Sequence, residues 1–323
     1  MRTQVVEVND AVGKLLGAPI FHPSGKKLLA KGHQVCEDDI RLLSSEGHLR
    51  VSVAVLEEGE VPEEEAALQI AQESARGSLE IRMAAGGRVN LHTTEPSCIL
   101  VKDEELRRLN RSSTVTAATL PSLSYAVAGQ RIGAVKTVPF GVPMRRFQEA
   151  LSIAQKAAPL IEARPIRNPT VATLYCDPLR GERARNLFEG IMRTRLDRFG
   201  TSASFVLSSI EEEEMLARNL QHLLRAKPTL VLVASTTSPA GPEDAVGRAM
   251  RRVGCRIENF LAPVEPGNLL LLAYADGIPV VAAPGCFRSP RPNVVDLILP
   301  PLLARYPLTA HEISGLGHGG LLQ

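Results

Sequence analysis

The feature that most constrains this chain is a pair of unbroken apolar runs in its last third. Thr229–Ala234 (TLVLVA) and Ile278–Ala283 (IPVVAA) carry no charged side chain. Such runs are typical of strands buried on both faces, as in parallel sheets covered by helices. Polar loops that contain glycine and proline follow each run. We therefore expect an α/β domain here, with these loops in a functional role.

Strands and helices alternate across the rest of this region. The apolar spacing predicts strands at 171–175, 204–207, 229–234, 256–260, 269–273 and 278–283, and helices at 182–199, 211–226, 242–253 and 293–304. Alternation of this kind gives a mostly parallel sheet with helices on both faces. We expect a three-layer α/β/α domain over residues 166–323, in which Pro300 and Pro301 break or kink the final helix.

Residues 1–165 show a different pattern. Residues 1–57 read as a small β-rich unit, and residues 58–165 mix short strands with helices in an α+β region. Ala163–Thr170 (ARPIRNPT) reads as the linker into the last domain. The expected fold class is α/β, with the C-terminal domain preceded by a β-rich α+β region.

The composition excludes several classes of partner. The 323 residues carry a net charge of +2 and only 4% aromatic side chains, which argues against a nucleic-acid partner. No apolar run approaches the roughly 20 residues of a membrane span, and the N-terminus lacks the apolar core of a signal peptide. Five scattered cysteines indicate a reducing cytoplasm and no metal site of the zinc type.

Ligands of open α/β sheets bind beyond the carboxyl ends of the strands. Ser235, Thr236, Thr237 and Ser238 follow a buried strand, so their hydroxyls are candidate donors to a phosphate or a heterocycle. A polar turn that caps the next helix is the alternative interpretation of the same residues. Asp177, which follows the first strand, is either a ligand contact or a turn-forming residue.

Two Pro-Gly loops supply the other candidate binding residues. These residues are Pro266, Gly267 and Asn268 in the first loop, and Pro284, Gly285, Cys286, Arg288, Ser289 and Asn293 in and after the second. Glycine lets backbone approach a ligand closely, and arginine supplies charge for a phosphate. Ordinary turns with surface arginines are the alternative. A nucleophilic role for Cys286 requires a base partner, and the sequence indicates none.

Three segments together resemble a known family. They are PGN at Pro266–Asn268, APGC-x-RSP at Ala283–Pro290 and the glycine-rich ISGLGHGGLL at Ile313–Leu322. In this combination they resemble the molybdopterin-binding proteins of molybdenum cofactor biosynthesis, the MoaB/Mog-like domain family. More narrowly, they resemble a bacterial branch whose members stand alone or precede a nucleotidyltransferase domain. The resemblance covers most of the chain and is strongest over residues 261–322.

The resemblance implies a protein that binds molybdopterin, or a molybdenum cofactor intermediate, and takes part in making or delivering the cofactor. It also implies that the two Pro-Gly loops form the pocket wall for the pterin and its phosphate. Besides molybdopterin, the expected partner is a cofactor nucleotidyltransferase or a molybdoenzyme. A homo-oligomer is compatible with the same sequence.

The sequence departs from the catalytic relatives, molybdopterin adenylyltransferase and molybdopterin molybdotransferase. Residues 234–237 replace the Gly-Gly turn of those enzymes, and residues 239–241 stand where they carry an aspartate. Asp177, Glu243 and Asp244 are the nearby carboxylates that could be catalytic or hold Mg²⁺. An adenylyl- or molybdotransferase that uses Mg²⁺ and a nucleotide is one alternative function. A diverged nucleotide-binding protein or pyridine-nucleotide hydrolase of the same fold is the other.

Overall fold

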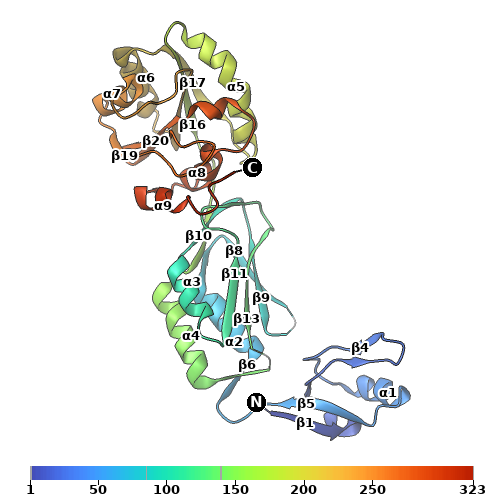
Figure 1. The fold of residues 1–323 in the computed structure, drawn as a ribbon. Helices are drawn as coiled ribbons and strands as arrows, with labels where there is room; N and C mark the ends of the chain where they lie inside the picture. Colours follow the sequence, from blue (N-terminus) through green and yellow to red (C-terminus); the bar gives the residue numbers. More distant parts are fainter. Residues whose placement is uncertain (1, 85, 139, 323) are drawn as a thin grey trace. The chain divides into compact units, whose positions relative to one another are not determined.

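The computed structural model describes residues 2–84, 86–138 and 140–322, and the chain divides into two compact units (Figure 1). Unit 1 takes its residues from the ranges Met1–Glu95, Ile99–Ser122 and Ala126–Ala163. Unit 2 takes its residues from Pro96–Cys98, Leu123–Tyr125 and Arg164–Gln323. The sequence predicted three parts, divided after residues 57 and 165. The first part falls in unit 1, and so does most of the second, apart from residues 96–98, 123–125 and 164–165.

The first 57 residues form a three-stranded antiparallel sheet, a hairpin and one helix. The elements are β1 (Arg2–Glu7), η1 (Val8–Ala11), β2 (Leu15–Leu16), β3 (Ile20–Phe21), β4 (Lys27–Leu29), α1 (Glu37–Ser45) and β5 (Arg50–Val55). Strand β5 lies between β1 and β2, and its Val51 and Val53 pack in one buried cluster with Leu43 of α1. Helix α1 starts after Cys36, whose backbone N–H donates to Asp39 Oδ2 at 2.9 Å, a cap that satisfies one free backbone donor.

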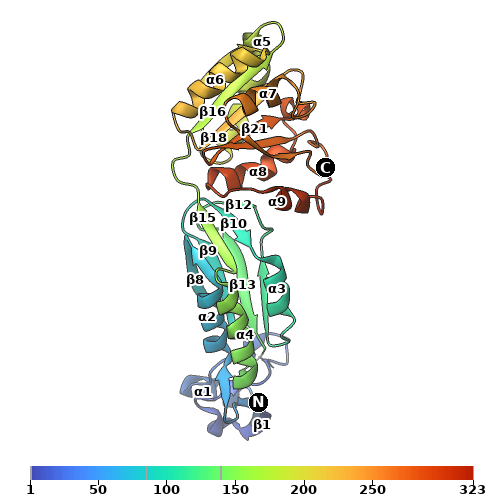
Figure 2. The same ribbon diagram turned by 90° about the vertical axis from the view of Figure 1, so that its left-hand side faces the viewer.

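Four antiparallel strands and two long helices form the core of the next region. The sheet has the order β11-β13-β9-β8, with β8 (Leu79–Ala84), β9 (Arg88–Thr93), β11 (Val115–Thr119) and β13 (Arg131–Thr137). Helices α2 (Glu63–Ser74) and α4 (Met144–Ala157) lie side by side (Figure 2), and the shorter α3 (Asp103–Asn110) packs on α4. Their alanine and leucine faces bury a common core with the sheet, as amphipathic helices do.

Two smaller sheets complete this part of the chain. One pairs β6 (Glu60–Pro62) with β14 (Gly141–Pro143), and the other has the order β12-β10-β15-β7. The strands of the second are β7 (Ala75–Gly77), β10 (Ser97–Val101), β12 (Tyr125–Ala126) and β15 (Ile161–Pro165). Strand β15 overlaps the start of the expected linker, so the linker prediction was wrong for residues 163–165. These residues are extended because Ile161 and Ala163 alternate into the core and the carbonyl of Ala163 accepts from Ser78 N at 2.9 Å.

The C-terminal unit contains a six-stranded sheet of order β17-β16-β18-β21-β20-β19. The strands are β16 (Val171–Asp177), β17 (Ala203–Ile210), β18 (Leu230–Ser235), β19 (Arg256–Phe260), β20 (Leu271–Ala275) and β21 (Ile278–Ala283). The first four strands in this order run parallel, whereas β20 is antiparallel to both of its neighbours. The prediction of a mostly parallel sheet is confirmed.

Helices cover both faces of this sheet. They are α5 (Gly181–Asp197), α6 (Glu213–Arg225), α7 (Ala245–Arg252) and α8 (Val294–Leu303), followed by the short α9 (Ala310–Gly315). Right-handed crossovers place α5 and α6 on opposite faces, because the chain moves from β16 to β17 and then back past β16 to β18. Helices α6 and α7 share one buried cluster with the sheet, while Arg195 of α5 contacts Asp296 of α8. Among the described residues, no helix is both long and apolar enough to cross a bilayer.

The final long helix is not broken by its prolines. Helix α8 runs through Pro300 and Pro301 to Leu303, so the expected break was wrong. A proline removes one amide donor. Both prolines lie in the second half of the helix, where the N–H of Ala304 still donates to the Pro300 carbonyl at 3.0 Å.

Truncation of the core should test this packing. Leu220 of α6 is fully buried in the cluster that α6 and α7 form with the sheet. We expect Leu220→Ala to lower the free energy of unfolding by about 2–5 kcal/mol, since it leaves a cavity. Leu187→Ala, on the half-exposed surface of α5, should change it by less than about 0.5 kcal/mol. Denaturant unfolding followed by circular dichroism measures both, and equal losses would contradict the assignment of Leu220 to the core.

Candidate functional site

The carboxyl ends of neighbouring parallel strands meet at one edge of the C-terminal sheet. Strand β16 ends at Asp177, β18 at Ser235 and β21 at Ala283. The register pairs Cys176 with Ser235, and Ala234 with Ala283, so these three ends lie side by side. The order of the strands reverses at β16, and such a reversal is where open α/β sheets bind ligands.

Asp177 is the buried acid of this edge. Its side chain is 0% exposed, and its Oδ1 accepts from the backbone N–H groups of Leu179 at 2.9 Å and Arg180 at 3.0 Å. Its Oδ2 accepts from Thr236 Oγ1 at 2.7 Å, and Arg183 Nη1 lies 3.5 Å away. The backbone bond from Arg180, the Thr236 hydroxyl and the Leu179 bond together hold the pKa of Asp177 below its ordinary value. The group is therefore a carboxylate at neutral pH. The turn-forming role is confirmed by its bonds to Leu179 and Arg180, and the ligand contact stays a prediction.

Glu211 is a second carboxylate that sequence reasoning missed. The predicted helix began at residue 211, but α6 begins at Glu213 and Glu211 lies in the loop after β17. Its Oε2 accepts from Ser235 Oγ and its Oε1 from Thr237 Oγ1, both at 2.6 Å. Its backbone N–H donates to the Asp177 carbonyl at 3.0 Å. An acidic residue directly after a parallel strand was the signal that could have identified it.

The hydroxyl groups of residues 235–237, in the loop after β18, therefore donate hydrogen bonds to the two carboxylates. Thr236 donates to Asp177, whereas Ser235 and Thr237 donate to Glu211 and contact each other at 2.9 Å. The predicted hydroxyl donors are thus already engaged with protein acceptors. Ser238 faces the second Pro-Gly loop instead: a Cβ added at Gly285 would lie 2.3 Å from Ser238 Oγ. The loops after β18 and β21 are in direct contact there.

The first Pro-Gly loop joins the same edge. The Pro266 carbonyl accepts from Val294 N at 3.3 Å, and a Cβ on Gly267, whose φ is +131°, would lie 2.6 Å from the Val294 side chain. Only glycine fits that approach. Pro266, Gly267 and Asn268 are thereby placed next to the start of α8.

Several candidates have structural partners that explain them. Asp244 caps α7 by accepting from Gly247 N at 2.8 Å, and Asn293 caps α8 by accepting from Val295 N at 2.9 Å. Glu243 is exposed and pairs with Arg251 at 2.5 Å. The structure does not bring Glu243 or Asp244 into the Asp177–Glu211 network: the Asp244 carboxylate receives backbone N–H groups of its own loop.

Arg195 fixes the loop that follows β21. The side chain is 1% exposed, its Nη2 donates to the carbonyls of Ser289 at 2.6 Å and Arg291 at 2.9 Å, and its Nη1 pairs with Asp296. Its guanidinium also lies 5.0 Å from the centroid of the Phe287 ring. Sequence reasoning did not identify this arginine, because a contact with a backbone carbonyl about a hundred residues away leaves no local pattern in the sequence.

The loop after β21, which Arg195 holds in place, carries the other residues that the sequence predicted. Phe287 is buried, whereas Arg288 is exposed and Ser289 is half-buried. Burial raises the pKa of the half-buried Cys286 thiol, and the Glu265 and Asp296 carboxylates add to the rise. A raised pKa leaves little thiolate at neutral pH, which disfavours a nucleophilic cysteine. In residues 2–84, 86–138 and 140–322 there is no group of three or more His, Cys, Asp or Glu side chains placed to hold a metal ion.

Comparisons with known proteins add little to this geometry. No protein-family model matches the chain, and no curated protein matches its sequence. The crystal structure of the molybdopterin biosynthesis MoeA protein from Pyrococcus horikosii aligns at 12% identity and a TM-score of 0.33, over 76% of this chain and 79% of that one. A molybdenum cofactor biosynthesis protein from Pyrococcus furiosus aligns at 11% identity and a TM-score of 0.26, over 95% of this chain but only 65% of that one. Scores this low carry no argument about activity.

Removal of the buried guanidinium should loosen the loop. In Arg195→Met, the carbonyls of Ser289 and Arg291 lose their donors, so Cys286 should react several-fold faster with a disulfide reagent. The reaction is followed at alkaline pH, because loss of the Arg195 charge also raises the pKa of the thiol. A Cys36→Ser background removes the exposed thiol, since Cys98, Cys176 and Cys255 are buried. Arg198→Met is the matched control, because Arg198 also contacts Asp296, at 3.4 Å, but is half-exposed. Equal reactivity in the two variants would refute the role of Arg195.

The buried aspartate should leave a signature in acid. A carboxylate whose pKa is lower in the folded protein than its ordinary value of 3.8 stabilises the fold above that value, and this contribution is lost as pH falls through the folded pKa. Asp177→Asn should lower the melting temperature at neutral pH and flatten its decline below about pH 5. Glu243→Gln, at an exposed ion pair, should keep the wild-type slope. Parallel curves for wild type and Asp177→Asn would contradict this account.

Proposed function

We propose that the C-terminal domain binds molybdopterin, or an intermediate of the molybdenum cofactor, at the carboxyl edge of its sheet. One observation carries the proposal: the three segments on which the sequence resemblance rests are neighbours in space. Pro266 O accepts from Val294 N at 3.3 Å, just beyond the second loop, and Glu265 N donates to Gly320 O at 2.7 Å in the glycine-rich segment. Residues far apart in sequence that converge at a strand-end edge are what a binding site requires.

The phosphate end of the ligand is assigned to the loop after β21. Arg288 is exposed in that loop, and guanidinium groups bind phosphate through paired N–H donors. Gly285 lies against Ser238 of the neighbouring loop, so a phosphate there would meet groups from both. The engagement of Ser235, Thr236 and Thr237 with carboxylates moves the expected phosphate contacts from those hydroxyls to Ser238 and Arg288.

A pterin assay on the purified full chain tests the proposal. The protein is expressed in a host that makes molybdopterin, and the bound cofactor is oxidised to its fluorescent form and quantified per chain. We expect near-stoichiometric fluorescence, reduced in Arg288→Ala about tenfold, since a charge-assisted hydrogen bond contributes that much to affinity. Gly285→Ala should reduce it too, because the new Cβ meets Ser238 Oγ.

Two control variants separate binding from folding. Arg218→Ala removes an exposed arginine of α6, and Gly241→Ala adds a Cβ whose nearest neighbour, on the Phe260 ring, is 3.9 Å away. Both should keep the wild-type fluorescence. A chain that carries no pterin, even after incubation with excess cofactor, would disprove the binding function.

A second function, an adenylyl- or molybdotransferase that uses Mg²⁺, is favoured by the carboxylate pair. Asp177 and Glu211 supply oxygen ligands from two adjacent strand ends, and the Glu211 N–H donates to the Asp177 carbonyl. Mg²⁺ is commonly held by one or two carboxylates together with phosphate oxygens of the substrate. An ion held by these two residues would draw the nucleotide phosphates to this end of the sheet. Glu211 would then join Asp177, which the sequence already named, in place of Glu243 and Asp244.

Calorimetric titration with ATP distinguishes the two functions. If the transferase reading holds, Mg²⁺ should tighten ATP binding by about tenfold or more, and both Asp177→Asn and Glu211→Gln should abolish the effect. Glu243→Gln, whose side chain pairs with Arg251, is the control and should retain it. ATP binding that is unchanged by Mg²⁺ would leave pterin binding as the function.

A further inference from the structure

A cavity of about 280 Å³ lies between the first Pro-Gly loop and the glycine-rich segment. Its lining includes Glu265, Asn268, Gly317, Gly320 and Leu321. Pockets for drug-sized ligands span about 300–1,000 Å³. A cavity at the lower limit suits one bicyclic ring rather than a whole cofactor with its nucleotide.

Two glycines allow the segments to approach closely enough to form this cavity. A Cβ on Gly320 would lie 2.4 Å from the Pro263 carbonyl oxygen, and one on Gly317 would lie 3.3 Å from the Pro263 side chain. The first distance excludes any side chain without movement of the backbone. The glycine-rich composition of this segment is thus explained by packing against residue 263.

Glu265 is the charged residue of the cavity lining. Its N–H donates to the Gly320 carbonyl at 2.7 Å, and its own carbonyl accepts from Leu322 N at 2.8 Å, which fixes the backbone from both sides. The side chain is exposed, and no described lysine, arginine or histidine pairs with it. Glu258 of the same domain, by contrast, pairs with Arg256 at 2.5 Å.

We propose that Glu265 reads the 2-amino-4-oxopyrimidine edge of a flat bicyclic ring bound in this cavity. That edge presents two adjacent N–H donors, and a carboxylate presents two acceptor oxygens with no donor, so the two groups match in a paired geometry. The Asn268 amide, at the same cavity, offers both a donor and an acceptor for the rest of the ring. The pterin of the proposed function carries this edge, and the inference rests on that function; guanine carries the same edge.

The cavity also lies near the loop that is expected to bind the phosphate substituent of the ligand. The loop that carries Glu265 lies next to the segment after β21, because the Pro266 carbonyl accepts from Val294 N at 3.3 Å. Arg288 lies in that segment. A ring in the cavity would therefore direct its phosphate substituent towards Arg288, which agrees with the phosphate assignment made above.

Pairs of ligands that differ at one group test the inference. The full chain, purified from a host that lacks molybdopterin, is titrated by calorimetry with pterin and lumazine, which has an oxygen in place of the 2-amino group. It is also titrated with GMP and with IMP, which lacks that group. We expect pterin to bind about tenfold more tightly than lumazine, because the site then keeps both hydrogen bonds to its carboxylate. A preference for GMP over IMP would identify guanine as a second source of the edge.

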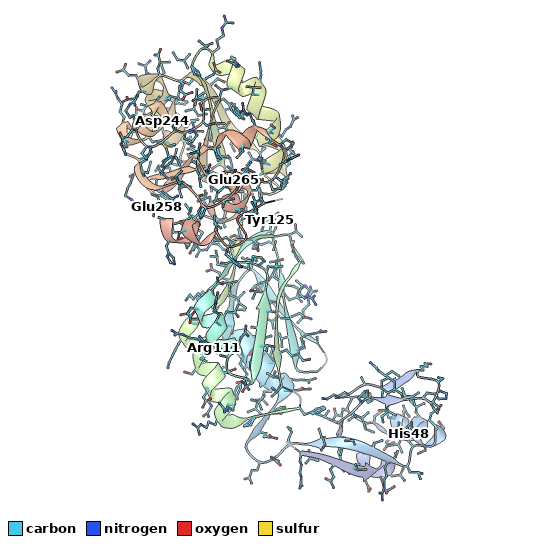
Figure 3. All side chains as sticks on the ribbon, in the orientation of Figure 1. His48, Arg111, Tyr125, Asp244, Glu258 and Glu265 are labelled. Atoms are coloured by element: carbon cyan, nitrogen blue, oxygen red, sulfur yellow. The ribbon has the colours of Figure 1, made fainter. Side chains whose placement is uncertain are left out.

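Variants of the carboxylate complete the experiment. Glu265→Gln should remove the preference for the amino-bearing ring, and Glu265→Asp should retain part of it. Glu243→Gln is the control, because it removes an exposed carboxylate elsewhere on the domain; the neighbouring Asp244 lies well apart from Glu265 (Figure 3).

The outcomes separate this inference from the proposed function. A preference that persists in Glu265→Gln, or a wild-type chain that distinguishes neither pair of rings, would overturn the role of Glu265. If molybdopterin still co-purifies with the wild type in that case, the binding function stands without it. If the chain carries no pterin but binds GMP more tightly than IMP, the role of Glu265 in recognising the 2-amino-4-oxopyrimidine edge is supported. The proposed pterin-binding function is then disproved.

Discussion

The parallel pairing of β16, β18 and β21 is the constraint on which the candidate site depends. Because these strands run in one direction, their carboxyl ends, at Asp177, Ser235 and Ala283, lie at the same edge of the sheet. The chain visits that edge at widely separated points in the sequence. Loops that would otherwise be unrelated are thus held within hydrogen-bonding distance of one another, on a scaffold whose strands are almost wholly buried.

Buried charge then determines what each loop can offer. Asp177 and Glu211 take up the hydroxyls of residues 235–237, so those hydroxyls are ordered before any ligand arrives. Arg195 donates hydrogen bonds to the carbonyls of Ser289 and Arg291, and these bonds fix the loop after β21. Pre-organisation of this kind lowers the entropic cost of binding, because the loops do not have to be ordered by the ligand.

The sequence predicted the scaffold better than it predicted the site. Apolar runs and helical spacing placed the strands and helices of the C-terminal domain to within a few residues, because burial on a parallel sheet imposes a local pattern. Glu211 was assigned to a helix because an acidic run before an apolar periodicity resembles a helix start. Arg195 and the contact between Glu265 and Gly320 depend on residues that are far apart in the sequence, and neither leaves a local pattern. The prolines of α8 were expected to break it, but the helix runs through both of them to Leu303.

A crystal structure of the full chain, purified from a molybdopterin-producing host, tests the central claim most directly. The account predicts electron density for a pterin between the loop at Glu265 and the glycine-rich segment, with its phosphate at Arg288 and Ser238. Pterin density at any other place on the chain would contradict it. So would an edge that stays free of ligand in a protein that carries the cofactor by chemical assay.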